Sequence, residues 1–122
     1  MSDATGGPLD AAALEHLFEI TGGDQEFFDE LVDTYLDDGV AQLAAMRAAA
    51  DADDPVALLR PAHTLKSSSA NVGALQLADA CRALEAAARG GTVDDPGATV
   101  EDIAALFDAA RGGLLAARKE RA

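Results

Sequence analysis

Apolar residues recur every three or four positions in five stretches of the chain, which is the spacing of amphipathic α-helices. The first stretch is short and runs from Asp10 to Ile20, where a Gly-Gly pair follows as a helix stop. Asp24 is placed to cap the second stretch, which is the longest and continues to about Ala50. The inward-facing positions expected of these two helices are Ala13, Leu14, Leu17, Phe18, Ile20, Phe28, Leu31, Val32, Tyr35, Leu36, Val40, Leu43 and Met46.

Three further stretches predict helices over residues 54–71 and 75–89 and over a last segment that carries Val100 to Ala117. Gly73 supplies the turn between the first two of these helices, and residues 94–97 form a polar connection to the last. The Gly-Gly pair at positions 112 and 113 should weaken the last helix locally. The inward-facing positions expected here are Leu58, Ala62, Leu65, Ser69, Val72, Leu77, Ala78, Cys81, Leu84, Ala88, Val100, Ile103, Leu106, Phe107, Ala110, Leu114 and Ala117.

The fold class that follows is all α, because no stretch alternates with the two-residue period of a strand. Four substantial helices with short connections pack most simply as an antiparallel up-and-down four-helix bundle, with the short additional N-terminal helix lying across one end. We expect residues 1–8 to be a flexible N-terminal leader and residues 9–122 to form a single domain. One monomer can bury all the apolar stripes, so we expect a monomer.

Composition restricts the partners. The net charge is −13 with 22 acidic and 9 basic residues, which makes nucleic acid and anionic membrane surfaces unfavourable partners. No apolar run is long enough for a membrane span and no signal peptide is visible, so we expect a cytoplasmic protein. The single cysteine, Cys81, has no disulfide partner and falls on an apolar stripe, which indicates a core position.

Candidate chemistry is concentrated in residues 62–73, AHTLKSSSANVG. At about 100° per residue, His63 lies away from the apolar stripe, and Lys66 and Ser67 follow it at i+3 and i+4 on the same face. An exposed imidazole is mostly neutral near pH 7 and has a free nitrogen lone pair that can attack phosphorus. Lys66 would stabilise negative charge on the phosphoryl oxygens, while the small side chains of Ser67 and Ala70 would admit a partner's active site.

Residues 60–89 also differ in charge from the rest of the chain. Their four cations and two acids give a balance of +2, so the remaining residues carry −15. A positive hairpin on an acidic protein is suited to docking a partner whose own site is acidic. The charged residues of this segment are Arg60, Lys66, Asp79, Arg82, Glu85 and Arg89.

Each of these features is ordinary when taken alone. A single helical histidine is usually structural or merely exposed, and we assign His16 no role for this reason. Lys66 alone would be a solvated lysine, and Glu85 with Arg89 an i, i+4 surface pair. No metal site is expected, because neither histidine has the Glu-x-x-His spacing of bundle metal proteins, and a hydrolase triad and a Gly-rich phosphate loop are also missing.

The segment AHTLKSSSANVGALQLADACRALE resembles the signature of the histidine-containing phosphotransfer (HPt) domain family, through His63, Leu65, Lys66, Ser67 and Gly73. The resemblance extends more loosely to nearly the whole chain. It implies that His63 is phosphorylated, that Lys66 assists electrostatically and that Glu85 and Arg89 flank the site. The residues predicted to support the site or dock a partner are Arg60, Ser67, Ala70, Gly73, Arg82, Glu85 and Arg89.

The implied function is a carrier in bacterial two-component signalling, which accepts a phosphoryl group from a receiver-domain aspartate on His63 and passes it to another receiver. Its partners would be response-regulator receiver domains and a hybrid histidine kinase. No cofactor of its own and no autokinase activity are expected, because the sequence has no nucleotide-binding motif; Mg²⁺ would come from the receiver. The alternatives are a docking inhibitor that does not transfer phosphate, and an enzyme or metal protein on a bundle scaffold.

Two positions depart from simple expectation. The family most often has Gly where this chain has Ser67, whose side chain could crowd the partner or hydrogen-bond a phosphoryl oxygen. Pro61 lies inside the third predicted helix, two residues before His63, and predicts a kink that presents the imidazole.

Overall fold

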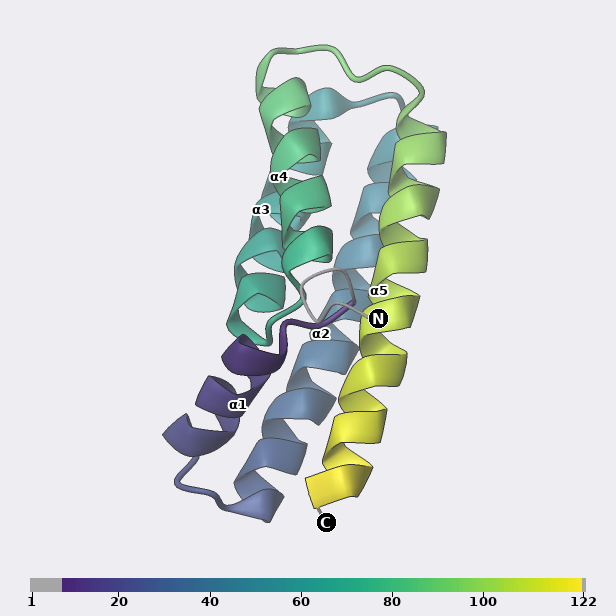
Figure 1. The fold of residues 1–122 in the computed structure, drawn as a ribbon. Helices are drawn as coiled ribbons and strands as arrows, with labels where there is room; N and C mark the ends of the chain where they lie inside the picture. Colours follow the sequence, from purple (N-terminus) through teal and green to yellow (C-terminus); the bar gives the residue numbers. More distant parts are fainter. Residues whose placement is uncertain (1–7, 122) are drawn as a thin grey trace.

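The computed structural model describes residues 8–121, and within them it contains five α-helices and no strand. They are α1 (Ala11–Ile20), α2 (Gln25–Asp51), α3 (Pro55–Asn71), α4 (Leu75–Arg89) and α5 (Pro96–Arg121). Helices α2 to α5 lie side by side and alternate in direction, and α1 extends below the α3–α4 hairpin beside the first half of α2 (Figure 1). The predicted all-α bundle with an additional N-terminal helix is confirmed. The proposed leader lies almost wholly outside the described residues.

Aspartates begin the first three helices, as their positions in the sequence indicate. The side chain of Asp10 accepts a hydrogen bond from the amide of Ala13 at 2.9 Å. Asp24 accepts from two amides at the start of α2, at 3.0 and 3.2 Å, and Asp54 accepts from the third residue of α3 at 3.2 Å. Each carboxylate satisfies amide groups that have no partner inside the helix, which fixes where the helix starts.

The last helix is longer than the sequence pattern suggested. It begins at Pro96, so the prediction that residues 96 and 97 belong to the connection was wrong. Proline is suited to the first helical turn because its missing amide would have no intrahelical partner there. The helix also continues through the Gly-Gly pair at 112 and 113. A Cβ at Gly113 would lie 2.8 Å from Cδ1 of Leu9, so a residue without a side chain lets the chain start pack against α5.

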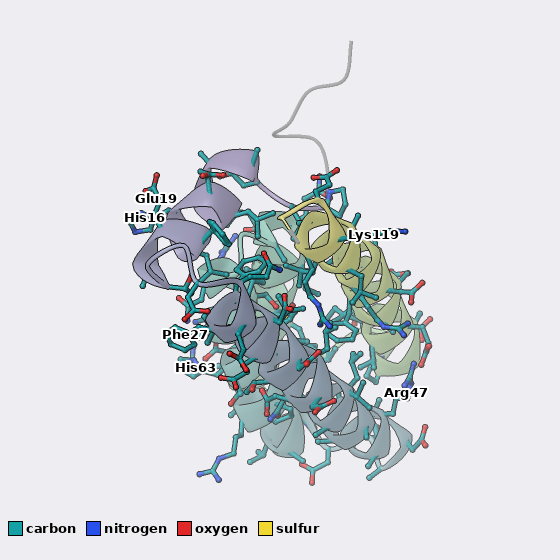
Figure 2. All side chains as sticks on the ribbon, turned by 90° about the horizontal axis from the view of Figure 1, so that it is seen from below. His16, Glu19, Phe27, Arg47, His63 and Lys119 are labelled. Carbon is teal, nitrogen blue, oxygen red and sulfur yellow. The ribbon has the colours of Figure 1, made fainter. Side chains whose placement is uncertain are left out.

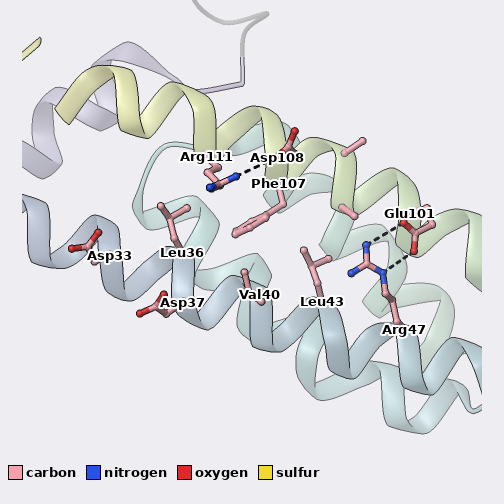
Figure 3. A pocket seen from close by; sticks show the side chains of 12 residues that line it. Asp33, Leu36, Asp37, Val40, Leu43, Arg47, Glu101, Phe107, Asp108 and Arg111 are labelled. Carbon is pink, nitrogen blue, oxygen red and sulfur yellow. Dashed lines mark hydrogen bonds and ion pairs between the residues drawn. The ribbon is translucent and has the colours of Figure 1, made fainter. Parts of the chain in front are cut away.

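The core lies along the inner faces of the four long helices. All the inward positions predicted for α3 and α4 are buried. Two predictions on the earlier helices were wrong: Val40 is 61% exposed and Ile20 is 64% exposed. Gly39 is buried in place of Val40, because the ring of Phe107 from α5 fills the space that a Cβ at position 39 would occupy. Phe107 points from α5 into the open groove of about 830 Å³ that α2 and α5 line (Figure 3).

Gly73 forms the turn between α3 and α4 and also receives the start of α1. Its φ is +84°, a left-handed conformation that favours glycine, and its carbonyl accepts a hydrogen bond from the amide of Asp10 at 2.7 Å. A Cβ at this position would lie 3.1 Å from the Asp10 carbonyl oxygen and 3.2 Å from Cβ of Ala13. The turn therefore has room for glycine alone, and it determines where α1 joins the bundle.

Helix α3 runs without interruption through the buried Pro61, and the kink expected there stays a prediction.

Among residues 8–121 no helix combines the length and apolar character needed to cross a membrane.

Candidate functional site

The exposed face of α3 presents a histidine and small side chains to solvent. The side chain of His63 is 59% exposed, and Ser67 and Ala70, one and two turns further along, are also exposed. Lys66 is more enclosed than expected, with 29% of its side chain exposed. This face forms because Leu58, Ala62 and Leu65 turn inward at helical spacing and leave the intervening positions outside.

Glu85 of α4 joins His63 to two cations. Its Oε2 accepts hydrogen bonds from Nδ1 of His63 at 2.9 Å and from the guanidinium of Arg89 at 2.8 Å. Its Oε1 accepts from Nζ of Lys66 at 2.9 Å. Two of these three donors come from α3 and one from α4, so the network links the two helices that form the hairpin.

The carboxyl group of Glu85 is ionised in this environment. Its pKa is lowered from the ordinary value of 4.5 to about 2. The largest cause is the hydrogen bond from Lys66, followed by that from Arg89; His63 contributes less, and burial acts in the opposite direction. Glu85 is only 4% exposed, so the alternative of an ordinary i, i+4 surface pair does not hold for Glu85. Its position seven residues after Ala78 and four after Cys81, both buried, is a signal in the sequence that places it on the inner face.

The ionised carboxylate also determines the tautomer of His63. A carboxylate without a proton can only accept hydrogen bonds, so Nδ1 of His63 must carry the hydrogen. In a neutral imidazole the other nitrogen, Nε2, then has a lone pair. The described residues provide no hydrogen-bond partner for Nε2. His63 therefore has a nucleophilic nitrogen on a mostly exposed ring.

An open depression of about 390 Å³ lies beside the ring. It is lined by Leu59, Arg60, His63, Thr64, Glu85 and Arg89. The structure thus brings Arg60 and Arg89 to the same hollow from α3 and α4. Arg82 is not part of this lining, and its guanidinium pairs with Asp79. Gly73 also lies away from the hollow and acts through the turn that it forms.

A second, more apolar groove of about 720 Å³ opens further along the same face of α3. Ala70 belongs to its lining and lies seven residues after His63, which is two turns along the same face of the helix. Helices α1 and α2 supply most of the other lining residues, including His16, Ile20 and Leu31. His16, Phe27 and His63 lie on one side of the molecule, opposite Arg47 and Lys119 (Figure 2). Ile20 and Phe27 are large apolar side chains exposed there.

Within residues 8–121 no group of three or more His, Cys, Asp or Glu side chains is arranged to hold a metal ion. Asp54 acts in helix capping, as described above, and Cys81 is buried in the core with its pKa raised to about 12 by desolvation.

A four-helix bundle with an exposed histidine on a central hairpin is the arrangement of a histidine phosphotransfer module, and comparisons with known proteins agree. A family model for the Hpt domain matches residues 30–113. The structure is similar to the crystal structure of histidine-containing phosphotransfer protein B (HptB) from Pseudomonas aeruginosa PAO1, with a TM-score of 0.84 and 33% sequence identity over 93% of this chain and 96% of that one. A search of curated proteins found no match. The chain belongs to the Hpt domain family and is a histidine phosphotransfer protein of the phosphorelay class.

Proposed function

We propose that His63 is the phosphoacceptor and that Nε2 is the nitrogen that receives the phosphoryl group from a receiver-domain aspartyl phosphate. The observation that carries this proposal is the 2.9 Å contact between Nδ1 of His63 and Oε2 of Glu85, since it leaves Nε2 with the lone pair. His16, the other histidine, has no such contact among the described residues.

Phosphoryl transfer to Nε2 requires no proton to move. Nε2 forms a bond to phosphorus while the bond between phosphorus and the aspartyl oxygen breaks, and the receiver's aspartate leaves as a carboxylate. The imidazole becomes positively charged because Nδ1 keeps its hydrogen. Glu85 faces that hydrogen and stabilises the positive charge as it develops, in the same way that a buried carboxylate supports a catalytic imidazolium. The reverse step passes the phosphoryl group to a second receiver.

Lys66 lies one helical turn after His63, where its ammonium group would stabilise negative charge on the phosphoryl oxygens. We expect the receiver to supply Mg²⁺ and this chain to bind no metal of its own. We also expect no label from ATP alone, because the sequence has no nucleotide-binding motif.

Receiver domains and a hybrid histidine kinase are the partners that we propose, in a 1:1 complex with a monomer of this chain. The docking surface would be the exposed face of α3 together with the apolar groove that begins at Ala70. Small side chains at Ser67 and Ala70 let another domain approach His63, and the exposed Ile20 and Phe27 provide apolar area at the rim. The +2 charge of residues 60–89 is complementary to an acidic receiver site.

The experiment that tests this function is phosphoryl uptake from a panel of phosphorylated receivers in the presence of Mg²⁺. We expect an acid-labile, alkali-stable label on the wild-type protein and none on His63→Gln. His16→Gln is the matched control, since it removes the other histidine of the chain. His16 lines the proposed docking groove, so this variant is judged by whether the label forms, which we expect, and not by the rate of labelling.

Each failure has its own meaning. If the label persists in His63→Gln and disappears in His16→Gln, then His16 is the acceptor and the proposal for His63 is wrong. Receivers that bind tightly and never transfer would indicate the docking inhibitor instead, and the exposed Ser67 in place of the family's usual Gly would then be the first residue to change.

A further inference from the structure

Arg60 differs from the other arginines of this acidic chain. Of the six arginines whose side chains the structure describes, five form ion pairs; they are Arg47, Arg82, Arg89, Arg111 and Arg118. Two of these pairs are visible beside the groove between α2 and α5 (Figure 3). Arg60 has no ion pair or hydrogen bond of its side chain to any described residue, although acids outnumber bases by 22 to 9 in the sequence.

The position of Arg60 is next to the nucleophile. It lies three residues before His63 on α3, so the two side chains are neighbours on the helix surface. It also lines the open depression of about 390 Å³ that His63 and Arg89 border. An arginine in such a place is positioned to meet whatever becomes attached to the imidazole.

The other two cations of the site are already engaged. Lys66 and Arg89 both donate to Glu85, at 2.9 and 2.8 Å, and Glu85 stays ionised. Arg60, Lys66, Arg89 and Glu85 together carry +2, and the phosphoryl group that transfer adds to the ring carries about −1.5 to −2 near pH 7. Without Arg60 these side chains would carry only +1. The planar guanidinium donates two parallel hydrogen bonds to phosphate oxygens, which gives it both charge and geometry for this role.

We propose that Arg60 binds the phosphoryl oxygens of phosphorylated His63 and holds the group on this protein. This inference rests on the proposed role of His63 as acceptor. In the unphosphorylated protein Arg60 is unpaired and available; after transfer it pairs with the dianion while Glu85 continues to hold Nδ1. Arg60 thereby shifts the equilibrium of phosphoryl exchange with a receiver toward this chain.

The first test needs no receiver. Protein carrying His16→Gln, so that His63 is the sole histidine, is phosphorylated with phosphoramidate, and the phosphoryl group is titrated by ³¹P NMR. A neighbouring guanidinium favours the dianion, so Arg60→Gln should raise the titration midpoint by about 0.5 pH unit. Arg60→Lys, which restores a charge without the planar fork, should recover part of that shift.

The second test measures the equilibrium ratio of phosphorylated protein to phosphorylated receiver. Arg60→Gln should lower this ratio about fivefold, the size expected for an ion pair at a largely exposed site. Arg111→Gln is the matched control, because it changes the net charge by the same amount. Arg111 and its partner Asp108 lie on α5 beside the groove between α2 and α5, and neither lines the depression at His63 (Figure 3). It should leave the midpoint and the ratio at their wild-type values.

If Arg60→Gln and Arg111→Gln have the same titration midpoint and the same phosphorylation ratio, then the proposed role of Arg60 is wrong. The phosphoryl group would then respond only to the net charge of the protein and not to a specific contact with Arg60. Arg60 and Arg111 are both exposed, so we expect circular dichroism to show that both variants fold. Failure of every receiver to label the wild-type protein would contradict the proposed function, whereas the phosphoramidate experiment would still decide the role of Arg60.

Discussion

Replacement of Glu85 by glutamine tests the central network directly. The carboxylate has two acceptor oxygens, of which Oε2 receives His63 and Arg89 and Oε1 receives Lys66. A glutamine amide has only one acceptor oxygen, and its NH₂ group can donate hydrogen bonds but not accept them. If the oxygen replaces Oε2, then Lys66 loses its partner. If it replaces Oε1, then the NH₂ group faces Nδ1, which must become an acceptor, and Nε2 takes the hydrogen and loses its lone pair.

Both arrangements slow phosphoryl transfer. In the first, no negative charge stabilises the imidazolium that forms, and in the second the nucleophile is blocked by the wrong tautomer. Loss of one charge-assisted hydrogen bond that strengthens in the transition state lowers a rate by about 10- to 100-fold. We expect Glu85→Gln to transfer more slowly than wild type by this factor, with the fold intact because the replacement has nearly the same shape.

The assay is rapid-quench measurement of transfer from a phosphorylated receiver at saturating concentration, together with ¹⁵N NMR of the imidazole to report which nitrogen carries the hydrogen. Asp79→Asn is the matched control, since it also removes a carboxylate from α4, and this carboxylate pairs with Arg82 at the surface and not with His63. A wild-type rate in Glu85→Gln, with Nδ1 still protonated, would refute the argument that Glu85 controls His63.

Two predictions concern stability. The pKa of Glu85 is lowered from 4.5 to about 2 in the folded protein, so its network stabilises the fold fully above about pH 4.5 and the stabilisation is lost as the pH falls toward 2. Urea denaturation of wild type and Glu85→Gln should give free energies of unfolding that differ most above pH 4.5 and converge toward pH 2; a constant difference would contradict this. Gly73→Ala should lose about 1–2 kcal/mol, because its φ of +84° is strained for alanine and the Asp10 carbonyl lies 3.1 Å from the new Cβ. Gly112→Ala, with nothing within 4 Å of its Cβ inside a helix, should gain about 0.5–1 kcal/mol, and equal stabilities of the two variants would contradict the conformational argument.

Helix positions and the exposed histidine were predictable from the sequence because they depend on local rules. Apolar spacing located all five helices, and aspartate caps fixed three of their starts within a residue. The same rotation of 100° per residue placed His63 and Ser67 outside and Leu65 inside, which the structure bears out. The predicted start of α5 was less accurate, because a proline followed by glycine is compatible with both a loop and a first helical turn.

Only the tertiary structure decided which side chains meet across helices. The partner of His63 is 22 residues away on α4, and the rotation of α3 and α4 about their own axes determines that Glu85 reaches it. The burial of Gly39 in place of Val40 likewise depends on the ring of Phe107 arriving from α5. Arg60 is unpaired for the same reason: no acid on a neighbouring helix comes within reach among the described residues. The sequence by itself therefore determined the helices and the acceptor candidate, whereas the network that prepares His63 depends on packing between helices, which periodicity within one helix does not encode.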